Sequence, residues 1–182
     1  MIRLFAAVAI PHAIGVSLAL AQNGLPGAQW HPPDKLHITL RFFGPVPENQ
    51  ADDLDSELAR VGGDAFDLTL AGVGEFGAAG RSNAVWAGIA ENPALRRLAA
   101  RCETAARRAG LTADKRAWRP HVRLAHRGGA EPARVAAWIQ DHNLLKSASF
   151  RVEAFGLYSS WRTDGGQTYQ LEGRYSLARA AA

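Results

Sequence analysis

Two short stretches with the same pattern constrain this chain more than any other feature. In residues 36–44 apolar and polar residues alternate, which predicts a half-buried strand with His37 and Thr39 on its polar face. The second stretch begins 84 residues later and puts His121 and Arg123 on one face. Because each strand offers a histidine and a polar residue two positions later, the two predict one anion-binding pocket built from two halves.

The composition is that of a globular chain with a mild basic excess. Of the 182 residues 47% are hydrophobic, enough to bury the core of one compact domain or two small lobes. The formal charge of +4 permits a polyanionic partner but does not by itself indicate one. Cys102 is the one cysteine, which excludes an intrachain disulfide and a cysteine-based zinc site, and we expect a buried structural thiol.

The N-terminal 21 residues superficially resemble a secretory signal peptide. They have a basic residue at position 3, continue as an apolar run and end on small residues. However, Pro11 divides the run into a strand-length and a helix-length piece, and both are needed by the repeat described below. No segment has the roughly 18 uninterrupted apolar residues of a membrane span. We therefore expect a cytoplasmic protein that does not interact with membranes.

The remaining elements follow from periodicity and from turn residues. Strands are predicted over residues 3–10, 66–70, 84–90, 150–158 and 167–177. Helices are predicted over residues 12–22, 48–61, 92–109 and 132–141. Loops are predicted over residues 23–35 and over the glycine-rich tract 72–80, which has no nucleotide-binding glycine pattern.

The longest predicted helix, residues 92–109, has two contrasting faces. One is an apolar stripe that includes Cys102, and Gly110 is a suitable residue to end the helix. The other is a row of arginines: Arg96, Arg97, Arg101, Arg107 and Arg108. This row would suit RNA, but a solvated helix face is the favoured interpretation.

A shift of 84 residues aligns more than the two motifs. It superimposes the helix after the first motif on the helix after the second, and residues 66–72 on 150–156, with Phe and Gly matching at the ends. The order of elements therefore predicts an α+β fold of two lobes related by a pseudo-twofold axis. Each lobe is expected to have an antiparallel sheet with helices on its outer face.

We accordingly treat residues 1–182 as a single bilobal domain made of two structural repeats. The motif strands lie at residues 36–42 and 120–125. A twofold axis would place these equivalent strands face to face, so the active site is expected in the groove between the lobes, with His37 and His121 close together.

Two histidine-containing strands in a duplicated α+β chain resemble the 2H phosphoesterase superfamily. Within it the chain looks most like the bacterial and archaeal RNA 2′,3′-cyclic phosphodiesterases, also called 2′-5′ RNA ligases. The resemblance covers nearly the whole chain, and its segments are Arg3-Leu4-Phe5, Leu36 to Gly44, Val85-Trp86-Ala87-Gly88 and Trp118 to Val122. The first motif matches in full, but the second has Arg123 where the family has threonine.

The resemblance implies metal-independent hydrolysis of RNA-terminal 2′,3′-cyclic phosphate to a 2′-phosphate, and its reversal as 2′-5′ ligation. It implies that His37 and His121 are the general acid and base, and we favour His37 as the acid. It also implies that the Thr39 hydroxyl contacts a non-bridging phosphate oxygen and that Phe42 stacks on the nucleobase. Phe42 could instead pack in the core.

Arg123 allows two interpretations. Its guanidinium is able to bind two phosphate oxygens and to lower the pKa of His121, which favours a base; this interpretation is preferred. Alternatively, the large side chain blocks the pocket, and the protein only binds RNA ends. The family's arginine five residues after the second histidine is replaced by His126, with Arg127 beside it, and the sequence does not choose between these two as phosphate ligands.

Other polar residues receive minor roles. Arg41 shares the predicted face of His37 and is expected at the rim of the pocket, in contact with phosphate. His12, His31 and His142 are isolated and are interpreted as loop or surface residues. No metal and no cofactor is expected, because no carboxylate or second histidine lies near either motif at the spacing of metal ligands.

The expected partners are RNA with 2′,3′-cyclic phosphate ends or cyclic nucleotides, bound by a monomer. The alternatives are an RNA-end-binding protein with degenerate catalysis and a phosphodiesterase for a small cyclic nucleotide such as ADP-ribose cyclic phosphate.

Overall fold

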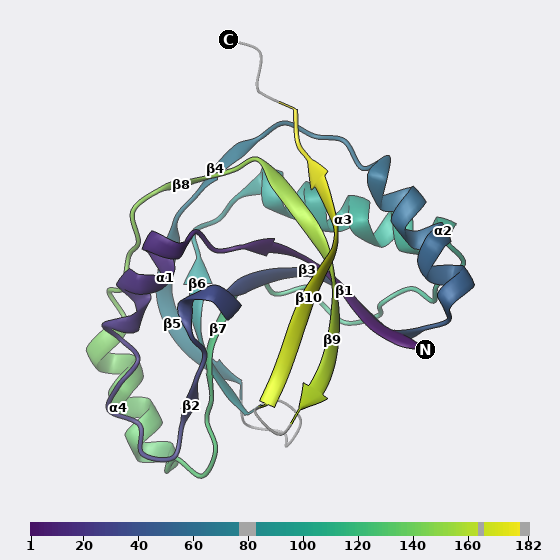
Figure 1. The fold of residues 1–182 in the computed structure, drawn as a ribbon. Coiled ribbons are helices and arrows are strands. Elements are labelled where there is room, and N and C mark those ends of the chain that lie inside the picture. Colours follow the sequence, from purple (N-terminus) through teal and green to yellow (C-terminus); the bar gives the residue numbers. More distant parts are fainter. Residues whose placement is uncertain (77–82, 164–165, 179–182) are drawn as a thin grey trace.

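The computed structural model describes residues 1–76, 83–163 and 166–178, which form an α+β fold (Figure 1). The strands are β1 (Ile2–Ala9), β2 (Gln29–Trp30), β3 (His37–Val46), β4 (Phe66–Leu68), β5 (Leu70–Phe76), β6 (Ala84–Ile89), β7 (Val122–His126), β8 (Phe150–Val152), β9 (Ala154–Thr163) and β10 (Gly166–Ser176). The helices are α1 (His12–Ala19), α2 (Glu48–Ala59), α3 (Pro93–Arg108) and α4 (Pro132–His142), with a short 3₁₀ helix η1 (Pro33–Lys35). The predicted fold class is confirmed.

One antiparallel sheet runs through the molecule, and it is nearly divided in two. Its strand order is β10-β9-β1-β3-β7-β6-β5, with β2 added beside β7, while β4 and β8 pair separately. Strands β3 and β7 share a single residue pair, Ile38 with Val122. The sheet therefore consists of two halves, β10-β9-β1-β3 and β7-β6-β5, which correspond to the two expected lobes and are joined at one position.

The helices are divided between the two halves of the sheet. Helix α3 packs against β3 and α2, and α2 also contacts β10, whereas α4 packs against β5. Figure 1 accordingly shows α2 and α3 together on one side, with α1 and α4 on the other. None of the helices in the described ranges is long and apolar enough to cross a membrane.

The chain contributes to the two halves in an interleaved way. Strand β9, late in the sequence, pairs with β1, and β5, which ends before residue 84, pairs with β6, which begins at residue 84 in the next predicted repeat. Strands β4 and β8, which start at residues 66 and 150, pair with each other. The predicted repeat of 84 residues stays a prediction, but under it neither repeat would form a lobe alone.

The long helix was predicted well. On α3 the buried residues are Leu95, Leu98, Ala99, Cys102, Ala105 and Ala106. The Asn92 side chain caps its start by accepting a hydrogen bond from the Leu95 N–H, at 2.9 Å. Gly110 follows the helix with a φ of 79°, a left-handed conformation that suits glycine. The arginine row is exposed, as expected.

The glycine-rich tract 72–80 was predicted as a loop, and this is wrong for its first part. Strand β5 continues to Phe76, while residues 77–82 lie outside the described residues. A Cβ at Gly74 would lie 2.4 Å from the Trp86 ring on the neighbouring strand, so this glycine lets the indole lie flat across β5. Glycine here serves packing rather than a turn.

Other differences concern boundaries. Residues 23–35 contain β2 and η1, and the strands predicted at 66–70 and 150–158 are each divided in two. Helices α1 and α2 end two to three residues earlier than predicted, at Ala19 and Ala59.

Candidate active site

The pair Ile38–Val122 sets the geometry of the two motif strands. In an antiparallel pairing the residues beside this pair lie opposite each other, so His37 faces Arg123 and Thr39 faces His121. Ile38 and Val122 are fully buried, so these four side chains lie on the other face of the sheet. The two histidines therefore lie diagonally across the junction between the halves, as the pseudo-twofold symmetry predicted.

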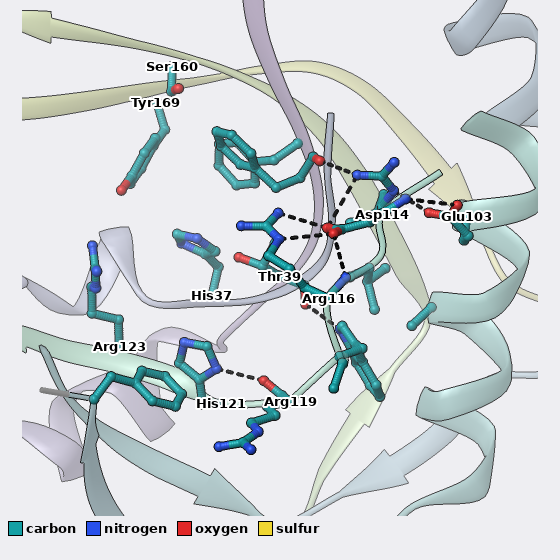
Figure 2. A pocket seen from close by; sticks show the side chains of 18 of the residues that line it. His37, Thr39, Glu103, Asp114, Arg116, Arg119, His121, Arg123, Ser160 and Tyr169 are labelled. Atoms are coloured by element: carbon teal, nitrogen blue, oxygen red, sulfur yellow. Dashed lines mark hydrogen bonds and ion pairs between the residues drawn. The ribbon is translucent and has the colours of Figure 1, made fainter. Parts of the chain in front are cut away.

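All four side chains line one cavity of about 1020 Å³. Figure 2 shows His37, Thr39, His121 and Arg123 converging on it, with Tyr169 on one side and the loop of Asp114 and Arg116 on the other. Among the lining side chains, arginines and lysines outnumber carboxylates seven to two. The cavity thus combines two histidines with a positive wall, which suits an anionic substrate.

The two histidines are held by equivalent hydrogen bonds. Nδ1 of His37 lies 2.9 Å from the Lys35 carbonyl oxygen, and Nδ1 of His121 lies 2.7 Å from the Arg119 carbonyl oxygen. Since a carbonyl oxygen only accepts, Nδ1 carries the hydrogen in both rings. Each ring therefore has Nε2 left for proton transfer, and in the neutral form this nitrogen accepts a proton.

Aromatic rings surround each histidine. The ring of His37 lies 5.0 Å from Phe5 and 5.2 Å from Tyr169, measured between centroids. His121 lies 4.8 Å from Phe76, edge to face, and 6.3 Å from Trp86. These contacts fix the ring planes and remove water from their faces.

Burial lowers the pKa of both histidines. For His37 burial is the main cause, the hydrogen bond to the Lys35 carbonyl acts in the opposite direction, and the charges of His121 and Arg123 lower the pKa further. The pKa of His121 is lowered by burial and by Arg123, against the hydrogen bond to Arg119. Both rings are therefore biased towards the neutral form when no anion is bound.

Thr39 joins the two motif segments through its backbone. Its carbonyl oxygen accepts a hydrogen bond of 3.0 Å from the Trp118 indole N–H, while its side chain lines the cavity. Trp118 belongs to the segment that leads into the second motif, so this bond adds to the single strand pair in fixing Thr39 against His121.

Arg123 lines the cavity without filling it. Its side chain is exposed, and its charge acts on His31, His37 and His121 together. The cavity stays open beside it, which disfavours the interpretation that Arg123 blocks the site.

A bulge in β3 reverses the alternation after Thr39. Ala7 pairs with Thr39 and Ala6 with Arg41, so Leu40 has no partner on β1. Phe42 consequently lines the cavity, and the Arg3 guanidinium lies over its ring at 5.5 Å from the centroid. Phe42 is therefore in a position to contact a substrate.

The same bulge changes the surroundings of Arg41, whose guanidinium is bound by protein groups at the cavity. Its side chain lines the cavity but is only 8% exposed. It forms an ion pair with Glu103 on α3 and donates a 2.7 Å hydrogen bond to the Thr112 carbonyl oxygen. Arg41 thus holds the loop between α3 and β7.

His126 and Arg127 are not among the residues that line the cavity. His126 is exposed and accepts a hydrogen bond from the Gly128 N–H through Nδ1, at 3.2 Å. Arg127 forms an ion pair of 2.7 Å with Glu75 on β5. The structure brings neither residue to the histidines.

His31 lines the cavity, although the sequence was interpreted as leaving it isolated. Strand β2 pairs with β7, and the His31 N–H then donates to the Leu124 carbonyl oxygen at 2.8 Å. Burial, helped by the charges of Arg123 and His37, lowers the pKa of His31 to about 4. A two-residue strand gives no periodic signal, so the sequence could not reveal this position.

Tyr169 was missed for another reason. Strand β10 was predicted, but not that β9 would pair with β1 and so bring β10 to the sheet edge from which Tyr169 reaches His37. By contrast, His12 is exposed and His142 stacks on Trp138, as expected for residues outside the site.

Comparisons with known proteins place this geometry in a family context. Residues 16–164 match the family model of the 2′-5′ RNA ligase superfamily. A relative from Thermus thermophilus, named RNA 2′,3′-cyclic phosphodiesterase, is 33% identical over 96% of this chain and 90% of its own length. One of the same name from Aeropyrum pernix is 30% identical over 84% and 87%.

The match to another relative of that name covers only part of both proteins. The protein from Geobacillus stearothermophilus is 33% identical over 61% of this chain, and the match covers only 36% of that protein.

Solved structures agree with the sequence comparisons. A structure described as a phosphoesterase has a TM-score of 0.82 at 25% identity and covers 98% of this chain, with 99% of its own length matched. Escherichia coli LigT in complex with 3′-AMP has a TM-score of 0.81 at 26% identity, with the same coverage.

Proposed function

This chain belongs to the 2′-5′ RNA ligase superfamily of 2H phosphoesterases, and on that basis we propose that it hydrolyses RNA-terminal 2′,3′-cyclic phosphate to a 2′-phosphomonoester. The observation that carries the proposal is the register of the motif strands. The pair Ile38–Val122 sets His37 and His121 diagonally on one face of the sheet, in one cavity. The names of the relatives support the substrate class.

The reaction requires an acid and a base on opposite sides of phosphorus. In the proposed step His121 Nε2 takes a proton from water, whose oxygen forms the new bond to phosphorus. His37 Nε2 gives its proton to the ribose O3′ as the P–O3′ bond breaks, leaving the phosphate on O2′. The two histidines supply both proton transfers, so the proposal requires no metal.

The pKa values bear on which histidine is the acid. The charge of Arg123 lowers the pKa of His121, which suits a base. The same charge acts on His37, so the bound phosphate has to raise the pKa of His37 for it to carry a proton. The negative charge of the cyclic phosphate provides this effect.

Thr39 and Arg123 are proposed to bind the non-bridging phosphate oxygens. Thr39 lies opposite His121 and Arg123 opposite His37, so the phosphate would have a hydroxyl on one side and a guanidinium on the other. A guanidinium binds two oxygens and stabilises charge in the transition state. Arg123 would therefore replace the family's threonine with a stronger ligand.

We further propose that Phe42 and Arg3 form the surface for the nucleobase. Arg3 already lies over one part of the Phe42 ring. A base would stack on the remaining ring surface or on the guanidinium plane, with little sequence preference.

Ligation would follow from the same site. By microscopic reversibility, a 5′-hydroxyl in place of water would be joined to the cyclic phosphate as a 2′-5′ linkage. Hydrolysis is expected to dominate in water.

The test is an assay of EDTA-treated protein on adenosine 2′,3′-cyclic monophosphate and on a short RNA ending in a cyclic phosphate. Wild type and Arg123→Thr are compared, and the product phosphate is mapped to O2′ or O3′. A 2′-phosphate from wild type supports the proposal. Inactive wild type with active Arg123→Thr would instead indicate an RNA-end-binding protein, and activity on the nucleotide alone a small-nucleotide phosphodiesterase.

A further inference from the structure

The cavity extends well beyond the two histidines. It continues past Thr39 to helix α3 and to the loop that holds Asp114 and Arg116. Figure 2 shows Arg116 and Asp114 on the side of Thr39 that faces α3, with the Arg116 side chain in the cavity. The volume of about 1020 Å³ thus includes a second polar region.

Arg116 is paired with Asp114 in this region. Its Nε–H and Nη2–H donate to the two carboxylate oxygens of Asp114, at 2.9 and 2.7 Å, and its backbone N–H donates to Oδ1 at 3.0 Å. Asp114 is itself fixed, because its N–H donates to Glu103 at 3.3 Å and Arg41 lies 3.5 Å from its carboxylate. The hydrogen bonds from Arg116 lower the pKa of Asp114 to about 2, so the carboxylate stays ionised at neutral pH.

The paired guanidinium retains donors for a ligand. An arginine has five N–H donors, and the bidentate pair uses one on Nε and one on Nη2. The other three point away from the carboxylate, and the side chain is 74% exposed. An exposed ion pair of this kind contributes little to stability. Its effect is to orient Arg116 within the cavity.

Two further arginines border the same region. Arg3 lies over the Phe42 ring, and Arg96, on the first turns of α3, lines the cavity while pairing with Glu91 at 2.9 Å. With Arg41 and Arg116 they make four cations, against the three carboxylates Glu91, Glu103 and Asp114 that pair with them. The region therefore favours an anion, and the remaining parallel donors of a guanidinium match the oxygens of a phosphate.

We propose that Arg116, held by Asp114, binds the phosphoryl group on the 5′-oxygen of the nucleoside whose cyclic phosphate lies between His37 and His121. The inference rests on the proposed function and deepens it. It makes the preferred substrate a nucleotide with a phosphate on both sides of its ribose, as at an RNA end, rather than a nucleoside cyclic phosphate alone. Asp114 is a positioning residue in this arrangement.

The test compares three substrates that differ only at the 5′-oxygen. They are adenosine 2′,3′-cyclic phosphate, its 5′-phosphorylated form, and the dinucleotide that has a 3′-5′ diester at that position. Wild type is expected to have a kcat/KM about tenfold or more higher for the two 5′-phosphorylated substrates. The monoester and the diester separate a small nucleotide from an RNA end as the source of the phosphate.

Variants assign the effect to Arg116. Arg116→Gln is expected to reduce the ratio of kcat/KM between 5′-phosphorylated and unphosphorylated substrates to near one. Asp114→Asn, which leaves the charge of Arg116 but removes its bidentate partner, is expected to reduce the ratio partly. Arg97→Gln, on an exposed position of α3 outside the cavity lining, is the matched control and keeps the wild-type ratio.

The outcomes are distinguishable. A wild-type ratio near one, with all three substrates hydrolysed, overturns the second subsite and leaves the proposed function intact. A high ratio that survives in Arg116→Gln also overturns it. If wild type hydrolyses none of the three, the proposed function fails and the subsite fails with it. Thermal unfolding of each variant checks that the fold is retained.

Discussion

His37 and His121 have matching backbone anchors and different neighbours. Each donates from Nδ1 to the carbonyl oxygen two residues earlier, so both present Nε2. Their surroundings come from different strands, with Phe5 and Tyr169 around one ring and Phe76 and Trp86 around the other. Equivalent anchors with unequal surroundings allow one residue to act as acid and the other as base.

Removing either histidine should abolish most turnover without unfolding the protein. We expect His37→Ala and His121→Ala each to lower kcat by about 100-fold or more, because one proton transfer then lacks its carrier. His12→Ala, at an exposed position on α1, is the control. Steady-state kinetics and circular dichroism measure the two properties, and full activity in either site variant would contradict the assignment.

The pH dependence follows from the direction of the pKa shifts. In the proposed mechanism one histidine is neutral and the other protonated, and burial lowers the pKa of both below the ordinary histidine value of 6.5 in the free protein. The plot of kcat/KM against pH should therefore be bell-shaped with its maximum below 6.5, rising as the base loses its proton and falling as the acid does. Bound phosphate raises both pKa values, so the maximum of kcat should lie at higher pH.

Arg123 provides the control for this profile. Its charge lowers the pKa of both histidines, so Arg123→Gln should move the kcat/KM maximum to higher pH. A maximum above pH 7 in wild type, or one that is unmoved in Arg123→Gln, would contradict the explanation.

At the scale of single elements, strand β3 shows which side-chain orientations local periodicity predicts and which it does not. Alternation correctly put His37 and Thr39 on one face and buried Ile38 and Leu40. The bulge after Thr39 depends on pairing with β1, which local periodicity does not contain. Local periodicity therefore gave no sign that Arg41 would pair with Glu103 on α3.

Strand β5 gives a prediction at the same scale. Gly74 leaves room for the Trp86 ring, which lies 6.3 Å from the His121 ring. Gly74→Ala should displace the indole and with it His121, lowering both the melting temperature and kcat. Gly62→Ala is the matched control, since a Cβ at Gly62 meets nothing within 4 Å. Thermal unfolding and kinetics measure the change, and an unaltered kcat in Gly74→Ala would show that Trp86 does not position His121.

At the scale of the whole molecule, the order and spacing of the elements were predictable, but the pairing of the strands was not. The sequence predicted two antiparallel lobes with a groove at the motifs. It could not show that β9 would pair with β1, or β6 with β7, because both pairings join residues far apart in the chain. Tyr169 and His31 reach the cavity only through such distant pairings, so both were missed.

Interleaving predicts that neither half of the chain folds alone. A fragment of residues 1–83 lacks β6 and β9, the partners of β5 and β1, and should have no cooperative unfolding transition. The full chain should unfold in one transition, coincident by tryptophan fluorescence and far-UV circular dichroism. Separate transitions, or a cooperatively folded fragment, would contradict this prediction.

The candidate active site lies at the junction between the two halves of the sheet, which share only the pair Ile38–Val122. A ligand that contacts His37 and Thr39 on one half and His121 and Arg123 on the other would bridge the two halves and stabilise their contact. It binds only when the lobes are docked, so it should raise the melting temperature in proportion to the logarithm of its concentration. During refolding, catalytic activity would return last, after both lobes have formed. Its return would therefore measure the association of the two lobes.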